Sequence, residues 1–142
     1  MPINIISSVY GLNPVINDES VIFSGTGNTK DLKFTIAYTS LLTNPNIKIA
    51  MYRRQYDEIY DTGYDLVDLQ DYVDQQLFGT SNQYEYLLID NPNATNQFTL
   101  VMNDQLLTGT YRLAFRLYDN NTMIGEIIRY IVIRWGKYGK FK

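Results

Sequence analysis

Alternation of apolar and polar residues constrains the fold of this chain more than any other feature of its sequence. The clearest case is Leu32–Thr39. The apolar residues on one of its faces are Leu32, Phe34, Ile36 and Tyr38. A period of two residues is typical of a half-buried β-strand, because successive side chains of a strand point to opposite faces. The chain is therefore predicted to consist mainly of β-structure.

Further strands are expected between polar turns. They are Ile3–Tyr10, Ser20–Ser24, Ile47–Arg54, Tyr84–Asp90, Gln97–Asn103, a strand within Leu106–Asn121, and Gly125–Arg134. The sequence GLNP at 11–14 is expected to form the turn that ends the first of these strands. The 13 tyrosines among 142 residues also favour strands over helices. Eight to ten strands in one domain of this length indicate a β-sandwich of two antiparallel sheets.

The segment 56–79 allows two interpretations. An extended hairpin is expected first, with DTG at 61–63 as its turn and YDLVDL at 64–69 as a strand. The alternative is a short helix over Asp68–Leu77. Its apolar residues at helical spacing are Leu69, Tyr72, Val73 and Leu77.

The stretch DQLLTGTYRL, Asp104–Leu113, resembles the tyrosine-corner segment of immunoglobulin-like and fibronectin-type domains. In those domains the hydroxyl of a tyrosine at the start of the next-to-last strand bonds to a backbone group a few residues upstream. The resemblance makes Tyr111 the corner tyrosine and Leu107 its upstream hydrophobic partner, and it makes Gly109 the residue that lets the chain bend.

The same resemblance implies an Ig-like β-sandwich over residues 1–134, followed by a tail at 135–142. In β-strand alternation Leu113, Phe115 and Leu117 are expected between the sheets, whereas Arg112 and Arg116 are expected to face water. The chain has no cysteine, and in being disulfide-free it resembles the Ig-like domains of bacteriophage virions and bacterial surface proteins.

The absence of histidine and cysteine removes the commonest general base, the usual zinc ligands and the common nucleophile–histidine pairs. We therefore expect no enzymatic activity, no catalytic residues and no cofactor. Seven acidic residues lie within 57–74, and calcium prefers such oxygen ligands. However, the spacing of an EF-hand loop is missing, so a solvated acidic face is expected there and no metal site is predicted.

The net charge of −3 gives the chain no overall electrostatic reason to bind nucleic acid. No apolar run approaches the roughly 18 residues needed to cross a bilayer, so membrane insertion is not expected. The first residues do not resemble a secretory signal, and synthesis in a cytoplasm is expected.

Two tyrosine- or cation-rich segments are the predicted interaction sites. The first is the arm that carries Tyr56, Tyr60 and Tyr64. The second is the tail WGKYGKFK, with Trp135, Lys137, Tyr138, Lys140 and Phe141 as its contact residues. Tyrosine combines apolar area with a polar tip, which suits a contact surface. Cross-strand packing of the arm and a solvated terminus are the alternatives.

These observations favour a non-enzymatic module that binds other protein subunits, with a homo-oligomer as one form. The first expectation is an auxiliary protein of a phage capsid, neck or tail, made in the host cytoplasm and located in the virion. One alternative is an Ig-like module of a bacterial cell-surface or adhesion protein. The other is a carbohydrate-binding sandwich that uses exposed tyrosines and Trp135 as stacking platforms.

Overall fold

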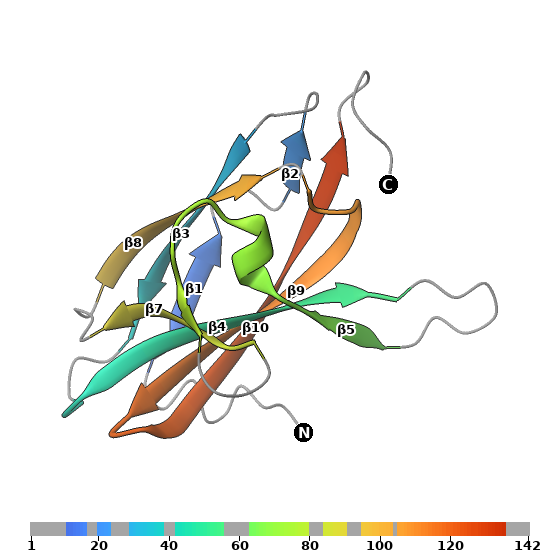
Figure 1. Cartoon of the computed structure of the whole chain (residues 1–142). Helices are drawn as coiled ribbons and strands as arrows, with labels where there is room; N and C mark the ends of the chain where they lie inside the picture. The colour runs from blue at the N-terminus through green and yellow to red at the C-terminus, as the bar shows by residue number, and fades with distance from the viewer. Residues whose placement is uncertain are drawn as a thin grey trace.

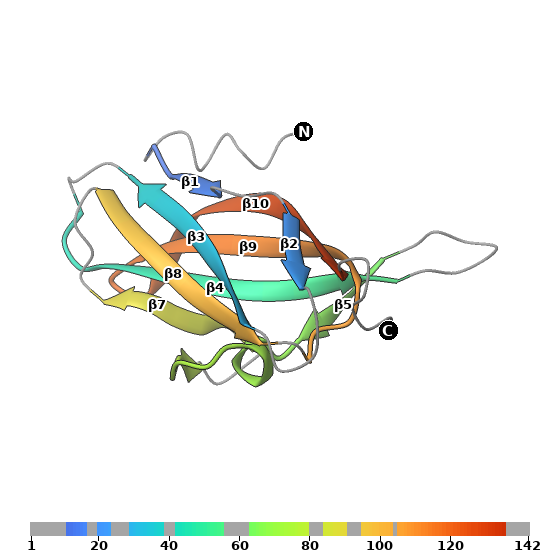
Figure 2. The same cartoon turned by 90° about the horizontal axis from the view of Figure 1, so that it is seen from above.

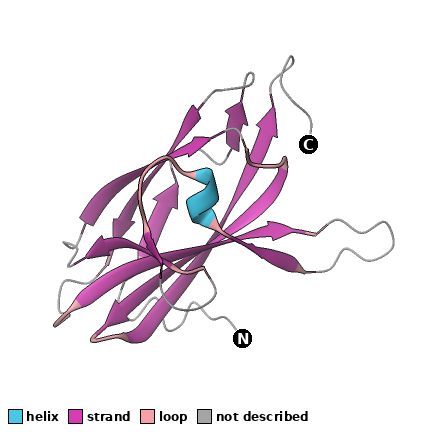
Figure 3. Ribbon diagram, viewed as in Figure 1, coloured by secondary structure: helices cyan, strands magenta, loops and turns pink. Residues whose placement is uncertain are grey.

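The computed structural model describes residues 11–16, 20–23, 29–38, 42–55, 63–79, 84–90, 95–103 and 105–135, which form an all-β sandwich (Figures 1 and 3). The described residues contain ten strands and one turn of 3₁₀ helix, η1. In chain order they are β1 (Asn13–Ile16), β2 (Ser20–Phe23), β3 (Thr29–Ala37), β4 (Pro45–Arg54), β5 (Tyr64–Val67), η1 (Leu69–Tyr72), β6 (Phe78–Gly79), β7 (Tyr86–Asp90), β8 (Thr95–Asn103), β9 (Gly109–Asp119) and β10 (Thr122–Trp135).

The strands form a small and a large sheet. The small sheet has the order β1-β3-β8, and the large sheet has the order β2-β10-β9-β4-β7-β6, with β5 paired to the free half of β4. Every pairing is antiparallel except that of β2 with β10, which is parallel. Figure 2 shows β3 and β8 crossing in front of β4, β9 and β10. The prediction of a two-sheet sandwich is confirmed.

The core lies between the two sheets and follows the predicted alternation. Phe34 on β3 stacks on Phe98 of the neighbouring strand, with ring centroids 5.5 Å apart. It also meets Phe115 of the large sheet edge-on at 5.2 Å. The predicted inward residues of β9 are Leu113, Phe115 and Leu117, and all three are fully buried. Aromatic contacts of this kind join the sheets and add to the hydrophobic stabilisation of burial.

The segment from β5 to β6 crosses from one sheet to the other. After β5 and η1, Val73 forms a β-bridge with Met102, and the amide of Asp74 donates to the carbonyl of Val101. The Gln75 side chain then donates to the carbonyl of Thr99 and accepts from the amide of Val101. This segment therefore covers an edge of β8 before the chain returns to the large sheet as β6.

Both interpretations of 56–79 are right for part of the segment. A strand is present at Tyr64–Val67, and a helix follows it, but the helix ends at Tyr72 instead of continuing to Leu77. Asp68 caps it by accepting a hydrogen bond from the amide of Gln70. The helix stops early because the next residues pair with β8. The apolar residues Leu69, Val73 and Leu77 are nevertheless buried, as their spacing predicted.

The prediction of a turn over GLNP is wrong in its second half. Asn13–Ile16 is a strand, β1, that pairs with β3, and Pro14 is part of it. Proline lacks an N–H, but it is tolerated in an edge strand such as this one. Arg129 of β10 donates to the carbonyl of Pro14 at 2.9 Å and ties β1 to the large sheet. The predicted strand Ile3–Tyr10 lies outside the described residues.

The tyrosine corner has the predicted hydrogen bond. The Tyr111 hydroxyl donates to the carbonyl of Leu107 at 2.7 Å, and Tyr111 is 1% exposed. The role expected for the Leu107 side chain is wrong, because it is 41% exposed and the buried neighbour is Leu106. Gly109 has φ +150°, and a Cβ there would lie 3.2 Å from the Arg53 Nε. Glycine therefore serves both the bend and the close approach of Arg53.

Candidate interaction surface

The outer face of the large sheet carries a connected set of tyrosine, arginine and glutamate side chains. The register aligns Tyr52 of β4, Arg112 of β9 and Tyr130 of β10 in one row across the sheet. A second row, four residues away along each strand, aligns Lys48, Arg116 and Glu126 in the same way. We call the side chains in and around these rows the outer-face cluster.

Arg116 is the centre of a closed ion network within this cluster. Its guanidinium donates to Glu85 at 2.7 Å, to Glu126 at 2.8 Å and to the Tyr52 hydroxyl at 3.1 Å. The Arg116 and Glu85 side chains are only 13% and 10% exposed. Burial works against the charge of Arg116, but these three hydrogen bonds outweigh it and raise the pKa of the guanidinium. The network thus holds a cation and two carboxylates with hydrogen-bond partners in a partly desolvated position.

Tyr118 extends the network toward the end of β9. Its hydroxyl lies 2.8 Å from both carboxylate oxygens of Glu85, and the Lys48 ammonium lies 4.3 Å from the centre of its ring. Burial, followed by the hydrogen bond to Glu85, raises the pKa of the Tyr118 hydroxyl to about 12. This end of the cluster is held by several contacts at once.

Arg112 lies in a different environment on the same strand and face. Its guanidinium carbon is 4.6 Å from the ring centre of Tyr52 and 4.5 Å from that of Tyr64. The Tyr64 ring in turn lies 6.2 Å from Tyr130, which is 53% exposed. We call Tyr52, Tyr64, Arg112 and Tyr130 the open end of the cluster. It presents aromatic rings and a cation where β4 pairs with β5, the two strands that lie together at the right of Figure 1.

Two alanines lie beneath the cluster and explain how its large side chains fit. Ala50 and Ala114 are register partners on β4 and β9, between the two rows. Both point to the outer face, yet both are fully buried. Larger side chains of the cluster therefore lie over them. Small residues at these positions leave the space that tyrosine and arginine side chains need on a flat sheet.

Of the predicted interaction residues, the structure describes the side chain of Tyr64 alone. It is partly buried on β5 and belongs to the open end. Tyr56, Tyr60, Lys137, Tyr138, Lys140 and Phe141 lie outside the described residues. Trp135 ends β10 with its backbone in register with Phe23 of β2, and its side chain also lies outside the description. The prediction that these residues form an interaction site stays a prediction.

The expectation that Arg112 and Arg116 simply face water is wrong. Both lie on the outer face, as alternation predicted, but Arg116 is ion-paired and Arg112 contacts two tyrosine rings. The partners come from strands far away in sequence, so alternation alone contains no sign of these contacts. The high tyrosine content was the one available signal, and it pointed to the arm instead of Tyr52 and Tyr118.

The described part of the acidic segment has local structural roles. Asp65 accepts a hydrogen bond from the Gln55 side chain at 2.6 Å. Asp68 accepts from the Tyr86 hydroxyl in addition to capping η1. Among the described residues, no three acidic side chains lie together in a way that would hold a metal ion. Across all the described residues, no helix is long and apolar enough to span a membrane.

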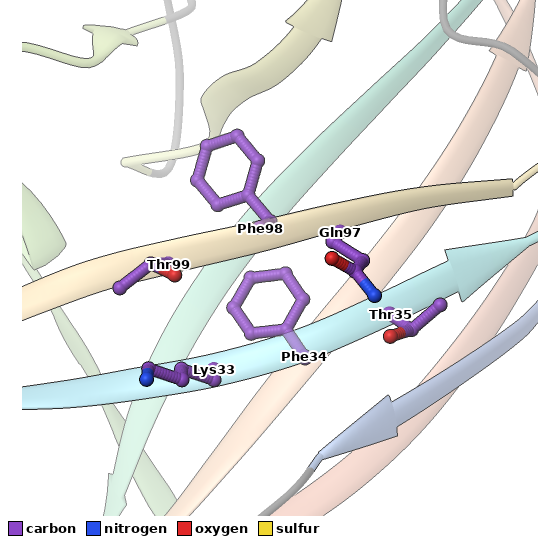
Figure 4. Close-up of a pocket in the computed structure, with 6 residues that line it drawn as sticks. All are labelled: Lys33, Phe34, Thr35, Gln97, Phe98 and Thr99. Carbon is purple, nitrogen blue, oxygen red and sulfur yellow. The ribbon is translucent and has the colours of Figure 1, made fainter.

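A shallow hollow lies on the small sheet (Figure 4). Its volume is about 110 Å³, and it is lined by Lys33, Phe34 and Thr35 of β3 and by Gln97, Phe98 and Thr99 of β8. The two phenylalanines turn toward the core, where they stack on each other. The hollow offers one cation and a few uncharged polar groups. It is therefore a weaker candidate for binding than the outer-face cluster.

No family model and no curated protein sequence matches the chain. Similar solved structures include the sporulation control protein Spo0M of Bacillus subtilis, at 8% identity and a TM-score of 0.45, over 87% of this chain and 48% of that one. Another is the alkylpurine DNA glycosylase AlkC of Pseudomonas fluorescens, at 9% identity and a TM-score of 0.40, over 93% and 33%. A third is an uncharacterized protein of Bacillus anthracis, at 11% and 0.40, over 83% and 85%. The chain thus spans about half of Spo0M and a third of AlkC, and likenesses this weak do not extend to function.

Proposed function

We propose that the chain is a non-enzymatic Ig-like module that binds a protein partner through the open end of its outer-face cluster. The observation that carries the proposal is the half-exposed ring of Tyr130 beside Tyr64, Tyr52 and Arg112. Tyrosine and arginine are the residue types enriched at the energetic centres of protein interfaces. The large, rigid side chain of tyrosine also loses little entropy when a partner covers it.

The strand order supports the Ig-like part of the proposal. The order β10-β9-β4 corresponds to strands G, F and C of an Ig domain, and β1-β3-β8 corresponds to A, B and E. Tyr111 also lies at the start of the next-to-last strand, as a corner tyrosine does. The parallel pairing of β2 with β10 departs from a purely antiparallel sandwich.

The setting in which such a module acts stays a proposal from the sequence. A phage virion protein is our first choice, a bacterial surface module is the second, and a carbohydrate-binding sandwich is the third.

Photo-cross-linking in the cells that produce the protein tests the proposal. A photoreactive phenylalanine analogue replaces Tyr130 in the full chain, and in a matched control it replaces Val15, a similarly exposed residue of the small sheet. We expect a discrete cross-linked protein, or a second copy of the chain, from position 130 and none from position 15. Mass spectrometry of the adduct identifies the partner. Equal cross-linking at both positions, or none at position 130, contradicts the proposal.

A further inference from the structure

We propose that Arg112 is a carboxylate-binding position, and that the protein partner places an aspartate or glutamate side chain against it. This inference rests on the proposed function and names the chemistry of the partner. It follows from the different contacts of two guanidinium groups, those of Arg112 and Arg116, which lie on the same strand and the same face.

Arg112 and Arg116 lie four residues apart on β9, and of the two only the Arg116 guanidinium has acceptors among the described residues. Arg116 donates to Glu85, Glu126 and Tyr52. The Arg112 guanidinium has no hydrogen bond and no ion pair within the described residues, and its Nε is buried without a partner there. Its contacts are the two rings of Tyr52 and Tyr64. At one end of the cluster the charged groups are therefore ion-paired, whereas at the other end the Arg112 cation has no ion pair among the described residues.

The two rings fix Arg112 before any ligand arrives. Contacts with the aromatic faces restrict the guanidinium, so less side-chain entropy is lost when an acceptor binds. A partner carboxylate that accepts from the guanidinium gains charge-assisted hydrogen bonds, which are stronger than those between neutral groups. The arrangement thus stabilises the bound state relative to the free one.

The chemistry of the open end favours a carboxylate on a protein. A guanidinium fork matches a carboxylate in a bidentate pair. Arg112 is the one cation among the four side chains of the open end, and a single cation suits a single negative charge better than a doubly charged phosphate. The exposed ring of Tyr130 next to Tyr64 offers apolar area for the residues that flank the acidic side chain in a peptide.

Nuclear magnetic resonance of the arginine Nε–Hε groups in the full chain tests the inference. The probes are an acetylated and amidated peptide, Gly-Tyr-Glu-Glu-Tyr-Gly, the same peptide with glutamine in place of both glutamates, and inorganic phosphate. We expect the glutamate peptide to shift the Arg112 signal in a saturable manner and to bind at least about tenfold more tightly than the glutamine peptide, as for loss of a charge-assisted hydrogen bond.

The variants separate charge from geometry. Arg112→Gln is expected to abolish the difference between the two peptides, and Arg112→Lys, which lacks the planar fork, is expected to reduce it. Arg134→Gln is the matched control, because Arg134 is an exposed arginine on the neighbouring strand β10. It should leave the difference unchanged. Thermal melting of each variant confirms that the fold is retained.

Several outcomes overturn the inference. They are equal shifts at Arg112 and Arg134, no shift at Arg112, equal affinity for the two peptides, or tighter binding of phosphate. The cross-linking experiment separates this failure from failure of the proposed function. A cross-link from position 130 that persists in Arg112→Gln leaves the interaction surface in place and removes only the acidic partner group.

Discussion

At the scale of single residues, the Tyr111 hydroxyl stabilises the connection between the two sheets. It donates to the Leu107 carbonyl from a fully buried position, so Tyr111→Phe removes a hydrogen bond and leaves that carbonyl with one partner fewer. We expect the variant to lose about 1 kcal/mol of unfolding free energy, measured by urea denaturation at pH 7.

Tyr130→Phe is the matched control for this prediction. Tyr130 is half exposed, and no described residue accepts from its hydroxyl, so loss of the oxygen is expected to change stability by less than about 0.5 kcal/mol. Equal effects of the two substitutions would contradict the assignment of Tyr111 as a corner.

The two arginines of β9 make a second residue-scale comparison. Arg116→Gln leaves the carboxylates of Glu85 and Glu126 facing each other without a counter-charge, in a partly buried position. We expect it to cost about 3 kcal/mol, as for a buried pair that loses one partner. Arg112→Gln, on the same strand and face, loses ring contacts alone and is expected to cost about 1 kcal/mol. Similar losses in urea denaturation would show that the network is not the source of stability.

At the scale of elements, the segment after η1 protects an edge of β8. The Gln75 side chain makes two hydrogen bonds to the β8 backbone, at 2.8 Å to Thr99 and 3.1 Å to Val101. Gln75→Ala is therefore expected to cost about 1–2 kcal/mol and to accelerate hydrogen exchange at the Val101 amide. Gln97→Ala is the control, because Gln97 is exposed on the same strand. Unchanged exchange at Val101 in Gln75→Ala would contradict the protective role.

Long alternating strands were predictable from sequence, and short irregular elements were not. The burial of Leu32, Phe34 and Ile36 follows from a period that only a strand satisfies. By contrast, β6 has two residues, and its pairing with β7 depends on the path of the whole β5–β6 segment. The early end of η1 has the same origin, because pairing with β8 overrides the helical spacing of Leu69, Val73 and Leu77.

At the scale of the whole molecule, the candidate surface depends on sheet register, which the sequence does not display. Arg116 meets Glu85 across 31 residues of sequence and Tyr52 across 64. Alternation places Arg116 on the outer face, but only the pairing of β9 with β4 brings Tyr52 within reach. The sequence therefore contained the residue types of the surface without their arrangement. Tyr64 was the one predicted interaction residue that the structure places in the open end.

The free energy of unfolding of the whole molecule is expected to fall at alkaline pH, because folding raises the pKa of several tyrosine hydroxyls. Burial is the main cause that raises the pKa values of Tyr111 and Tyr118 to about 12, from an ordinary value near 10. Between these values the unfolded chain binds fewer protons than the folded chain, so stability falls as the pH rises. The contribution is fully present below pH 10 and is lost progressively as the pH approaches 12.

Urea denaturation midpoints at pH 8, 10, 11 and 12, with tyrosinate absorbance recorded in parallel, measure this loss. The contribution of one tyrosine is isolated by comparing the wild type with Tyr118→Phe. The variant loses the hydrogen bond to Glu85 and is expected to be less stable at pH 8. It is also expected to lose less stability between pH 10 and 12. The reason is that the variant lacks the Tyr118 hydroxyl, whose pKa is raised in the folded state and which therefore couples folding to pH. An equal fall in both proteins would mean that burial of Tyr118 does not couple its ionisation to unfolding.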